Sequence, residues 1–216
     1  MIRFSQVSKT YSEGFQALQG ISLSISAGEL VFFIGHSNAG KSTLLKLIAA
    51  IEQPTSGVVE VGKLNIGTLR RSMVPYLRRS LGLILQEQRI LYDRTVLDNV
   101  LLPLQVMGME SRAAIARAHA ALDKVGLLRR EKANPASLSG GEKQRMCIAR
   151  AVVHRPSVLI ADEPTANLDA AYAQDIMTVF QSFHQVGVTV LIATHDLALI
   201  GDRSRIVQLY QGKLAE

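Results

Sequence analysis

The sequence predicts an α/β fold in which helices cover both faces of a mostly parallel β-sheet. Three observations predict it. Wholly apolar runs such as Leu30–Ile34 and residues 158–161 are typical of strands buried on both faces. These runs alternate with segments of helical periodicity, as in sheets with crossover helices. A glycine-rich segment joins one such run to a helix, which is the arrangement of a phosphate loop.

Composition favours a single globular domain. The chain has 216 residues, of which 48% are hydrophobic and 19% are charged, so it can bury a core and is not a disordered tail. Its single cysteine, Cys147, excludes a disulfide framework and a cysteine-based zinc site, and fits a reducing, cytoplasmic compartment. No apolar run approaches the roughly twenty residues of a spanning helix.

The N-terminal part reads as strands around one helix. Ile2, Phe4 and Val7 begin an alternating strand, and residues 21–25 alternate apolar residues with serine, as a half-buried strand does. Residues 41–51 follow the glycine-rich segment and read as a helix. Residues 57–61 read as another strand, which ends at a glycine.

The middle of the chain is helical, and the last third returns to alternation. Between residues 93 and 150 we expect helices, one of them capped by Ser111 and ended by Gly126. Its buried face would hold Ile115, Ala118, Leu122 and Val125. Further on, we expect strands at 158–161, 188–193 and Arg205–Tyr210, with a helix that buries Ile176, Val179, Phe180 and Phe183. The predicted organisation is one domain, 1–216, with a core and β lobe in about 1–87 and 151–216, and a helical lobe in about 88–150.

The chain is basic, with a net charge of +6 and a pI near 9.7. A solvated basic surface is the favoured interpretation, and contact with an anionic membrane surface is the alternative. A nucleic-acid partner is disfavoured, because aromatic residues make up only 5% of the chain and tryptophan is absent.

Residues 35–42 read Gly-His-Ser-Asn-Ala-Gly-Lys-Ser and fit the phosphate-loop pattern. Backbone N–H groups at a helix N-terminus would face the phosphates, Lys41 would reach the β- and γ-phosphates, and Ser42 would offer an oxygen to Mg²⁺. Asn38 replaces a frequent glycine, and asparagine tolerates a positive φ. The predicted nucleotide-binding residues here are Gly35, His36, Ser37, Asn38, Ala39, Gly40, Lys41, Ser42 and Thr43.

Two acidic residues follow the apolar run 158–161. By itself, an acidic pair after a strand is more often a helix cap or a turn. With a phosphate loop upstream the preference reverses, because the carboxyl ends of the strands line the ligand crevice in such folds. We expect Asp162 to hold Mg²⁺ and Glu163 to polarise the attacking water.

Ser139, Gly140, Gly141 and Glu142 open a helix and offer a hydroxyl and free N–H groups at its positive end. Taken alone, they are a plain helix start. In this order, between phosphate loop and acidic strand, residues 138–142 resemble the signature motif of the ATP-binding cassette (ABC) ATPases. The resemblance implies a P-loop NTPase fold with a RecA-like core, an antiparallel β lobe and an inserted α-helical lobe.

The resemblance also implies roles for residues elsewhere. Tyr11 would stack on adenine, Gln86 would sense Mg²⁺ and the attacking water, and His195 would contact the γ-phosphate. Residues 167–169 (Asn-Leu-Asp) would contact an opposite subunit. The alternatives are a surface tyrosine, a structural histidine and a helix cap at Asp169. A second copy would supply Ser139 and Gly141, so that ATP binding forms a homodimer with two sites.

Within the family, the chain resembles most the ATPases of bacterial cell division, through His36 and residues 75–79, 93–100 and 121–128. It departs from the usual pattern at Asn38, at residues 87–88 (Glu-Gln, where Asp-His or Asn-His is expected) and at Ala166. These departures concern turnover rather than family membership.

The narrower resemblance implies a partner and an output. The partner would be the membrane protein FtsX, with a short helix docked near Gln86 and the inserted helices, at the cytoplasmic face of the inner membrane. The output would be control of cell-wall hydrolases. Two alternatives stay open: the ATPase of a lipoprotein-release or macrolide-type exporter, and a nucleotide-gated binding module with incidental hydrolysis. A DNA-repair or translation protein is disfavoured by length, and a phosphotransferase by the signature segment.

Overall fold

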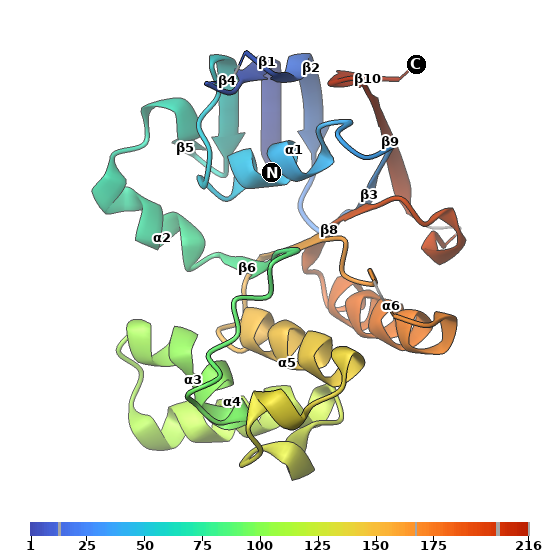
Figure 1. Cartoon of the computed structure of the whole chain (residues 1–216). Helices are drawn as coiled ribbons and strands as arrows, with labels where there is room; N and C mark the ends of the chain where they lie inside the picture. The colour runs from blue at the N-terminus through green and yellow to red at the C-terminus, as the bar shows by residue number, and fades with distance from the viewer. Residues whose placement is uncertain (13, 167, 202–203, 216) are drawn as a thin grey trace.

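The computed structural model describes residues 1–12, 14–166, 168–201 and 204–215. Two sheets enclose helix α1, and the remaining long helices cover the far side of the larger sheet (Figure 1). The smaller sheet has the order β2-β1-β4-β5 and is antiparallel. Its strands are β1 (Ile2–Thr10), β2 (Gln16–Ile25), β4 (Ser56–Val61) and β5 (Leu64–Asn65).

The larger sheet has the order β10-β9-β3-β8-β7-β6, and only the short edge strand β10 is antiparallel to its neighbour. The predicted α/β class with a mostly parallel sheet is therefore confirmed. Its strands are β3 (Leu30–Ile34), β6 (Leu81–Ile84), β7 (Val158–Asp162), β8 (Thr189–Thr194), β9 (Arg205–Tyr210) and β10 (Lys213–Leu214).

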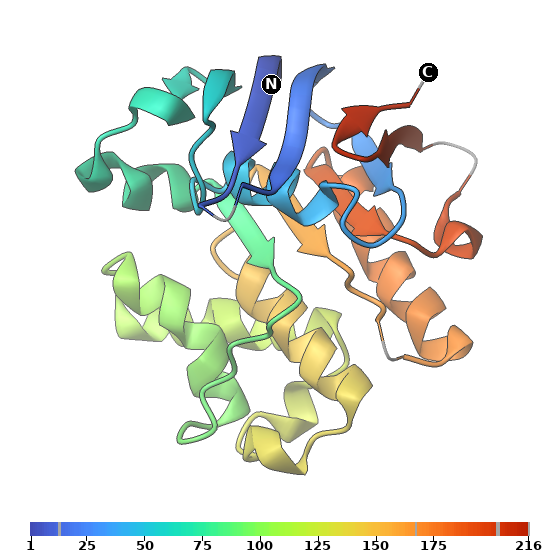
Figure 2. The same ribbon diagram turned by 45° about the horizontal axis from the view of Figure 1, so that its top comes forward.

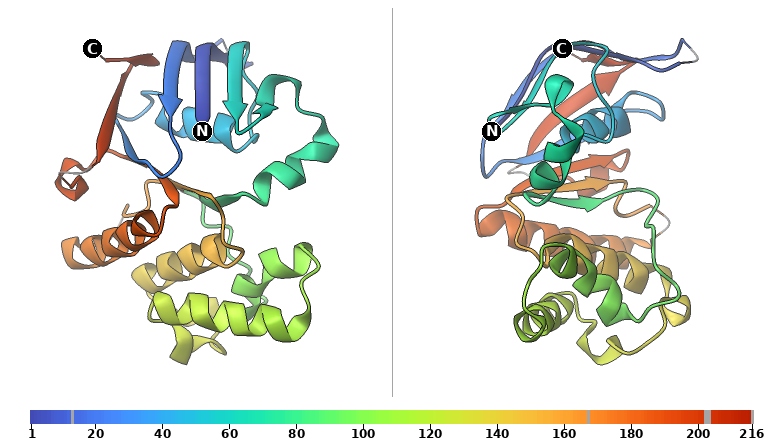
Figure 3. Two further views of the ribbon diagram at one scale, coloured as in Figure 1. Left: turned by 180° about the vertical axis from the view of Figure 1, so that it is seen from behind. Right: turned by 90° about the vertical axis from the view of Figure 1, so that its left-hand side faces the viewer.

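The helices lie in two layers, as Figures 2 and 3 show from other directions. Helix α1 lies between the sheets, while α3, α4, α5 and α6 lie on the side of the larger sheet away from the smaller one. The helices are α1 (Lys41–Ile48), α2 (Val74–Arg78), α3 (Val96–Val106), α4 (Ser111–Lys124), α5 (Gly140–Val152) and α6 (Ala170–Gln185). None of the helices in the described ranges has the length and hydropathy of a membrane span.

Strand β3 shows why a wholly apolar strand belongs in the centre. Side chains of a strand alternate between its two faces. Phe33 joins the core around α1, whereas Phe32 joins the core formed with the helical layer, and both are buried. Each ring of this size removes well over 100 Å² of apolar surface from water. The strand therefore connects two hydrophobic cores.

The helical middle of the chain departs from the sequence expectations in its details. Glu110, not Ser111, caps α4, because its carboxylate accepts hydrogen bonds from the N–H groups of residues 112 and 113. Ile115, which was expected on the buried face of this helix, is 41% exposed, and Ala114 is buried there instead. Gly126 does end this segment, with a positive φ of 69°. The helix expected at 41–51 ends earlier, at residue 48.

Helix α3 has a start signal that the sequence analysis did not use. The hydroxyl of Thr95 accepts from the N–H of Asp98, and the Asp98 carboxylate accepts from the N–H of Thr95. This reciprocal pair is the capping box, and the spacing of threonine and aspartate would have located it.

Gly82, at the centre of β6, allows α5 to lie directly against the sheet. A Cβ atom there would collide with the carbonyl oxygen of Ala151 and would lie 2.9 Å from Cδ1 of Leu159. We expect Gly82→Ala to lower the free energy of unfolding by about 1–3 kcal/mol, because the helix must move away. Thermal and urea unfolding measure this change. Gly67→Ala is the control, since its Cβ would make only ordinary contacts. Equal stability of the two variants would contradict the prediction.

Candidate active site

The glycine-rich segment forms the turn between β3 and α1. Gly35 and Gly40 have φ values of 149° and 105°, and Asn38 has a φ of 63°, in agreement with the expectation that asparagine accepts a positive φ at this position. A Cβ atom on Gly40 would lie only 2.6 Å from the carbonyl oxygen of Ala17. Glycine is therefore required where the loop enters α1.

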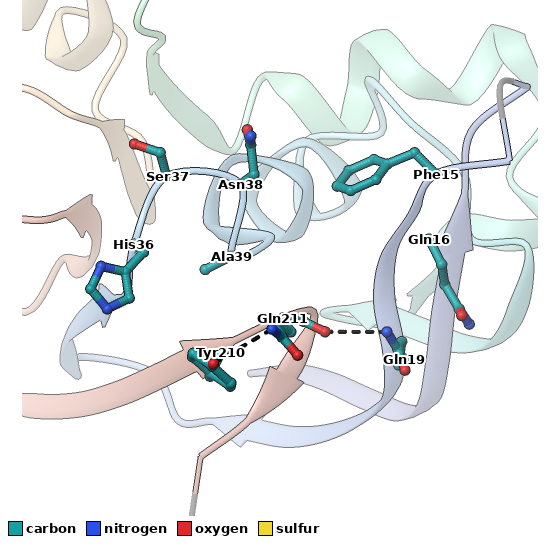
Figure 4. A pocket seen from close by; sticks show the side chains of 9 residues that line it. All are labelled: Phe15, Gln16, Gln19, His36, Ser37, Asn38, Ala39, Tyr210 and Gln211. Carbon is teal, nitrogen blue, oxygen red and sulfur yellow. Dashed lines mark hydrogen bonds between the residues drawn. The ribbon is translucent and has the colours of Figure 1, made fainter.

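The exposed side chains of Ser37 and Asn38 in this loop point outward, whereas Ala39 is buried. Figure 4 shows Ser37 and Asn38 pointing away from Tyr210, while the methyl group of Ala39 lies on the side of Tyr210. A cavity of about 460 Å³ separates the loop from Phe15 and Tyr210. Anion binding by this loop would consequently fall to its backbone N–H groups.

Lys41 and Glu163 meet although they are far apart in sequence. The ammonium of Lys41 donates to the carbonyl oxygens of Gly35 (2.7 Å) and His36 (3.2 Å) and lies 3.7 Å from Oε1 of Glu163. Lys41 is 6% exposed. Its charge is balanced by one carboxylate and two carbonyl dipoles, which is the kind of compensation that a buried ammonium needs.

Glu163 is held on its other side by His195, which follows β8. Nδ1 of His195 lies 2.9 Å from Oε2 of Glu163. The backbone of Glu163 has a φ of 49°, and its N–H donates to the carbonyl of Ala193. A positive φ costs a residue other than glycine about 1–2 kcal/mol. The carboxylate of Glu163 thus lies between a lysine and a histidine, and its backbone is strained in this position.

Asp162, at the end of β7, is paired with the residue after Lys41. The hydroxyl of Ser42 donates to Oδ1 of Asp162 at 2.9 Å. Asp162 is buried, and this burial raises the pKa of its carboxyl above the usual range. The Ser42 hydroxyl lowers this pKa, the negative charge of Glu163 raises it further, and the positive charges of Lys46 and Lys41 lower it. The net rise means that these partners compensate the buried charge only in part.

Gln86 follows β6, the strand next to β7. Its exposed side chain lines a cavity of about 480 Å³ together with Ser42 and Asp162. A second cavity of about 540 Å³ joins Gln86 to Glu163 and to Gly140 at the start of α5. Gln86 therefore lies next to the Ser42–Asp162 pair on one side and next to Glu163 on the other.

Tyr11 follows β1 and reaches across to α1. Its hydroxyl lies 3.2 Å from the hydroxyl oxygen of Thr43, and the ammonium of Lys9 lies 5.0 Å from the centre of its ring. Lys9 is itself held by Glu52 at 2.7 Å. Lys9 was not among the residues expected from the sequence, although its position in β1, two residues before Tyr11, was the available signal.

The signature segment lies apart from the phosphate loop. Ser139 caps α5 and forms a reciprocal pair with Glu142, whose pKa is lowered mainly by the N–H of Ser139. Within the described ranges, no hydrogen bond links residues 139–142 to residues 35–43. One copy of the chain therefore brings together Lys41, Ser42, Asp162, Glu163 and His195. Of the signature segment, Gly140 shares a cavity with Glu163, but no hydrogen bond joins the described signature residues to the phosphate loop.

The predicted subunit-contact segment 167–169 is described only in part. Asn167 lies outside the described residues. Asp169 caps α6 by accepting from the N–H of Tyr172 at 3.0 Å, so the helix-cap alternative holds for this residue. The ring of Tyr172 in turn lies against Gly141, which places the start of α6 beside the signature helix.

Comparison with known proteins agrees with this geometry. The family model described as "ABC transporter" matches residues 18–166, more than half of the chain. Among solved structures, the ATP-binding cassette MJ0796, in a dimeric post-hydrolysis state bound to ADP and Pi, superposes with a TM-score of 0.93 at 32% identity. This match covers 100% of this chain and 97% of that one. The structure of cbiO1 from Clostridium perfringens has a TM-score of 0.89 at 29% identity, covering 100% and 86%.

The chain belongs to the ABC transporter family and is an ATP-binding, ATP-hydrolysing cassette of that family. Its relatives include proteins named "Cell division ATP-binding protein FtsE". That of Escherichia coli K12 is 53% identical over 99% of this chain and 97% of its own length. That of Bacillus subtilis is 37% identical over 98% and 93%. The predicted resemblance to the cell-division ATPases is confirmed.

Asp162→Asn should stabilise the nucleotide-free protein at pH 7. A carboxyl whose pKa is raised by folding contributes stability below its unfolded pKa, and this contribution is lost as pH rises through the folded pKa. Asparagine removes the buried charge and keeps an oxygen for the Ser42 hydroxyl. Thermal unfolding without Mg²⁺ or nucleotide should show an advantage of the variant that grows from about pH 4 to pH 7.

Asp175→Asn, at an exposed position on α6, is the matched control and should show no such trend. A melting temperature of Asp162→Asn at or below that of the wild type at pH 7 would contradict the prediction.

Proposed function

We propose that the chain hydrolyses the γ-phosphate of ATP with Glu163 as the base, in a site that two copies share, and that this activity serves cell division. The observation that carries the chemistry is the row of contacts from Lys41 through Glu163 to His195, next to the Ser42–Asp162 pair. Asp162, Glu163 and His195 lie at or just after the ends of β7 and β8, and Lys41 and Ser42 open α1 after the neighbouring strand β3. The cell-division role is supported by the FtsE relatives, which match nearly the full chain.

Nucleotide binding would rearrange Lys41. Its ammonium is now satisfied by two carbonyls and lies 3.7 Å from Glu163. A phosphate offers a charged acceptor, and charge-assisted bonds are roughly twice as strong as neutral ones. Binding of the β- and γ-phosphates would therefore draw Lys41 away from Glu163. The carboxylate would then be free to accept a proton.

Hydrolysis would proceed by in-line attack of water on the γ-phosphorus. The oxygen of the water forms the new bond, its proton goes to Glu163, and ADP leaves with the electrons of the broken bond. His195 holds Oε2 of Glu163 through Nδ1, so the carboxylate keeps one orientation. Gln86 borders the same cavity as Glu163 and would orient the water.

Magnesium fits the residues present. Ser42 Oγ and Asp162 Oδ1 are hard oxygen donors 2.9 Å apart, and Gln86 lines the cavity beside them. Mg²⁺ prefers one or two protein oxygens together with phosphate and water oxygens. When bound, the ion would supply positive charge to the phosphate oxygens. A Mg²⁺ ion would also compensate the buried charge of Asp162.

The signature helix would act on a second copy. Its N-terminal N–H groups suit a phosphate, but the described residues give it no bond to its own phosphate loop. A head-to-tail dimer with a two-fold axis would place Ser139 and Gly141 of each copy against the nucleotide of the other. The two MJ0796 structures, both dimeric, support this arrangement.

The partner proposed for the membrane is FtsX, with the chain bound peripherally at the inner membrane. The docking site was expected near Gln86 and the inserted helices, and the groove proposed here borders the inserted helix α3 but does not include Gln86. It is a cavity of about 270 Å³ between α2, α3 and the end of α5, lined by Pro75, Arg78, Arg79, Pro103, Val106, Met107 and His154. Val106, in this lining, and Tyr76, on α2, are strongly exposed. An apolar segment with acidic flanks would suit this surface, since arginines border it. ATP-driven dimerisation would move this segment and so control cell-wall hydrolases.

Glu163→Gln should keep ATP binding and stop turnover. Glutamine cannot take the proton, so the hydrolysis rate should fall by about two to four orders of magnitude. Because ATP would persist between the copies, the variant should elute as a dimer with Mg-ATP and as a monomer without it. Steady-state hydrolysis and size-exclusion chromatography with light scattering measure the two effects.

Glu60→Gln, on β4 of the smaller sheet, is the control and should behave as the wild type. An unchanged rate would remove Glu163 from its role. A Glu163→Gln protein that stays monomeric with saturating Mg-ATP would contradict the shared site.

Val106→Glu should weaken capture of FtsX. Val106 is 70% exposed at the rim of the groove, and a carboxylate there would compete for the bordering arginines and repel the acidic flanks of the docked segment. We expect at least a tenfold loss of FtsX recovered from detergent-solubilised membranes, with unchanged ATP hydrolysis by the isolated chain. Val186→Glu, at a 73% exposed valine after α6, should leave recovery unchanged. Equal recovery with both variants would contradict docking at this groove.

A further inference from the structure

The segment that carries Gln86 is fastened to the signature helix two residues further on. The side-chain amide of Gln88 donates to Oε1 of Gln144, on α5, at 2.7 Å. Gln144 is only 6% exposed, and Gln88 is half-buried. This bond is partly buried, and a hydrogen bond between two side chains that is partly removed from water fixes their separation more firmly than a fully exposed one. Gln86 lies within about 7 Å of Gln88 along the chain.

The backbone of the same segment is held by the same helix. The guanidinium of Arg150, also on α5, donates to the carbonyl oxygens of Gln88 and Arg89. Arg89 has a φ of 45°, a conformation that costs a residue with a side chain about 1–2 kcal/mol. The segment is thus kept in a strained geometry by contacts from α5.

The position of this link relates it to both nucleotide sites. Gln88 and Gln144 line the cavity of about 540 Å³ that also holds Gln86, Glu163 and Gly140. At one end of α5, Ser139 would face the nucleotide of the partner subunit. One turn into the helix, Gln144 holds the segment of Gln86, which faces the chain's own nucleotide. A single rigid helix therefore contacts elements of two sites.

We propose that Gln88 is a positioning residue for Gln86, and that its hydrogen bond to Gln144 transmits the position of the signature helix to the water-orienting glutamine. The proposal rests on the proposed shared site. When α5 closes on the partner's nucleotide, Gln88 moves with it and brings Gln86 to its own site. Residues 87–88, Glu-Gln in this chain, depart from the expected Asp-His or Asn-His pattern at this point of contact.

The test is a double-mutant cycle in the full-length chain with Mg-ATP. Gln88→Leu and Gln144→Leu keep the approximate volume of the side chains and remove the hydrogen bond. We expect each to lower kcat by roughly five- to tenfold with KM for ATP unchanged, because Tyr11, Lys41 and Ser42 are untouched. The double variant should be no slower than either single variant, since all three lack the same link.

A conservative variant separates positioning from simple stability. Gln88→Glu can still accept a hydrogen bond from Gln144, whose amide needs only to rotate by half a turn. It should recover most of kcat at an unchanged melting temperature. Gln185→Leu, at the exposed end of α6, is the matched control and should keep the wild-type kcat.

The outcomes decide the proposal. If the two single losses in kcat multiply in the double variant, which is an additive cycle in free energy, the proposal is overturned. Losses in kcat that only follow losses in melting temperature would overturn it as well. A rise in KM without a fall in kcat would also overturn it, because the pair would then serve nucleotide binding. The dimerisation of Glu163→Gln is measured separately. A monomeric Glu163→Gln protein would refute the shared site, whereas an intact dimer with an additive cycle would refute only the role of Gln88.

Discussion

The structure depends on one geometric constraint, which is that parallel strands end at a common edge. Lys41 follows β3, Glu163 follows β7 and His195 follows β8, and these strands are neighbours in the sheet. The side chains of these three residues therefore meet although the residues are far apart in the sequence. The hydrogen bonds of the sheet set the separation of the strands, and from this edge the Glu163 side chain reaches to 3.7 Å from Lys41, at the start of α1, and to 2.9 Å from His195.

The polar residues at this edge are stabilised less well than the rest of the core. Asp162 is a buried carboxylate with a raised pKa, and Glu163 keeps a positive φ. Both features cost stability in the nucleotide-free protein. A buried carboxylate and a strained backbone are typical of a site whose charges are balanced only when phosphate and a cation are bound. Ligand binding would then add to folding stability.

Helix α5 connects the sheet, the signature segment and the segment after β6. It packs against β6 at Gly82, presents Ser139 at its N-terminus and holds Gln88 through Gln144. A helix is stiff over this length, so movement at one end reaches the other. The helical layer is therefore the part of the fold that could relate the two nucleotide sites proposed for a pair of copies, and the second hydrophobic core keeps it on the sheet.

The sequence alone determined the strands with wholly apolar runs, the phosphate loop and the family. Strand burial and glycine spacing are local signals in adjacent residues, and the order of the motifs along the chain can be seen without any tertiary contact. Tertiary structure decided the remainder. Ala114 rather than Ile115 lies on the buried face of α4, because packing against the neighbouring helices sets the rotation of a helix about its axis. Glu110 rather than Ser111 caps this helix. Tertiary structure also decided the pairing of Gln88 with Gln144, since residues 56 apart meet only when the folded chain brings β6 beside α5.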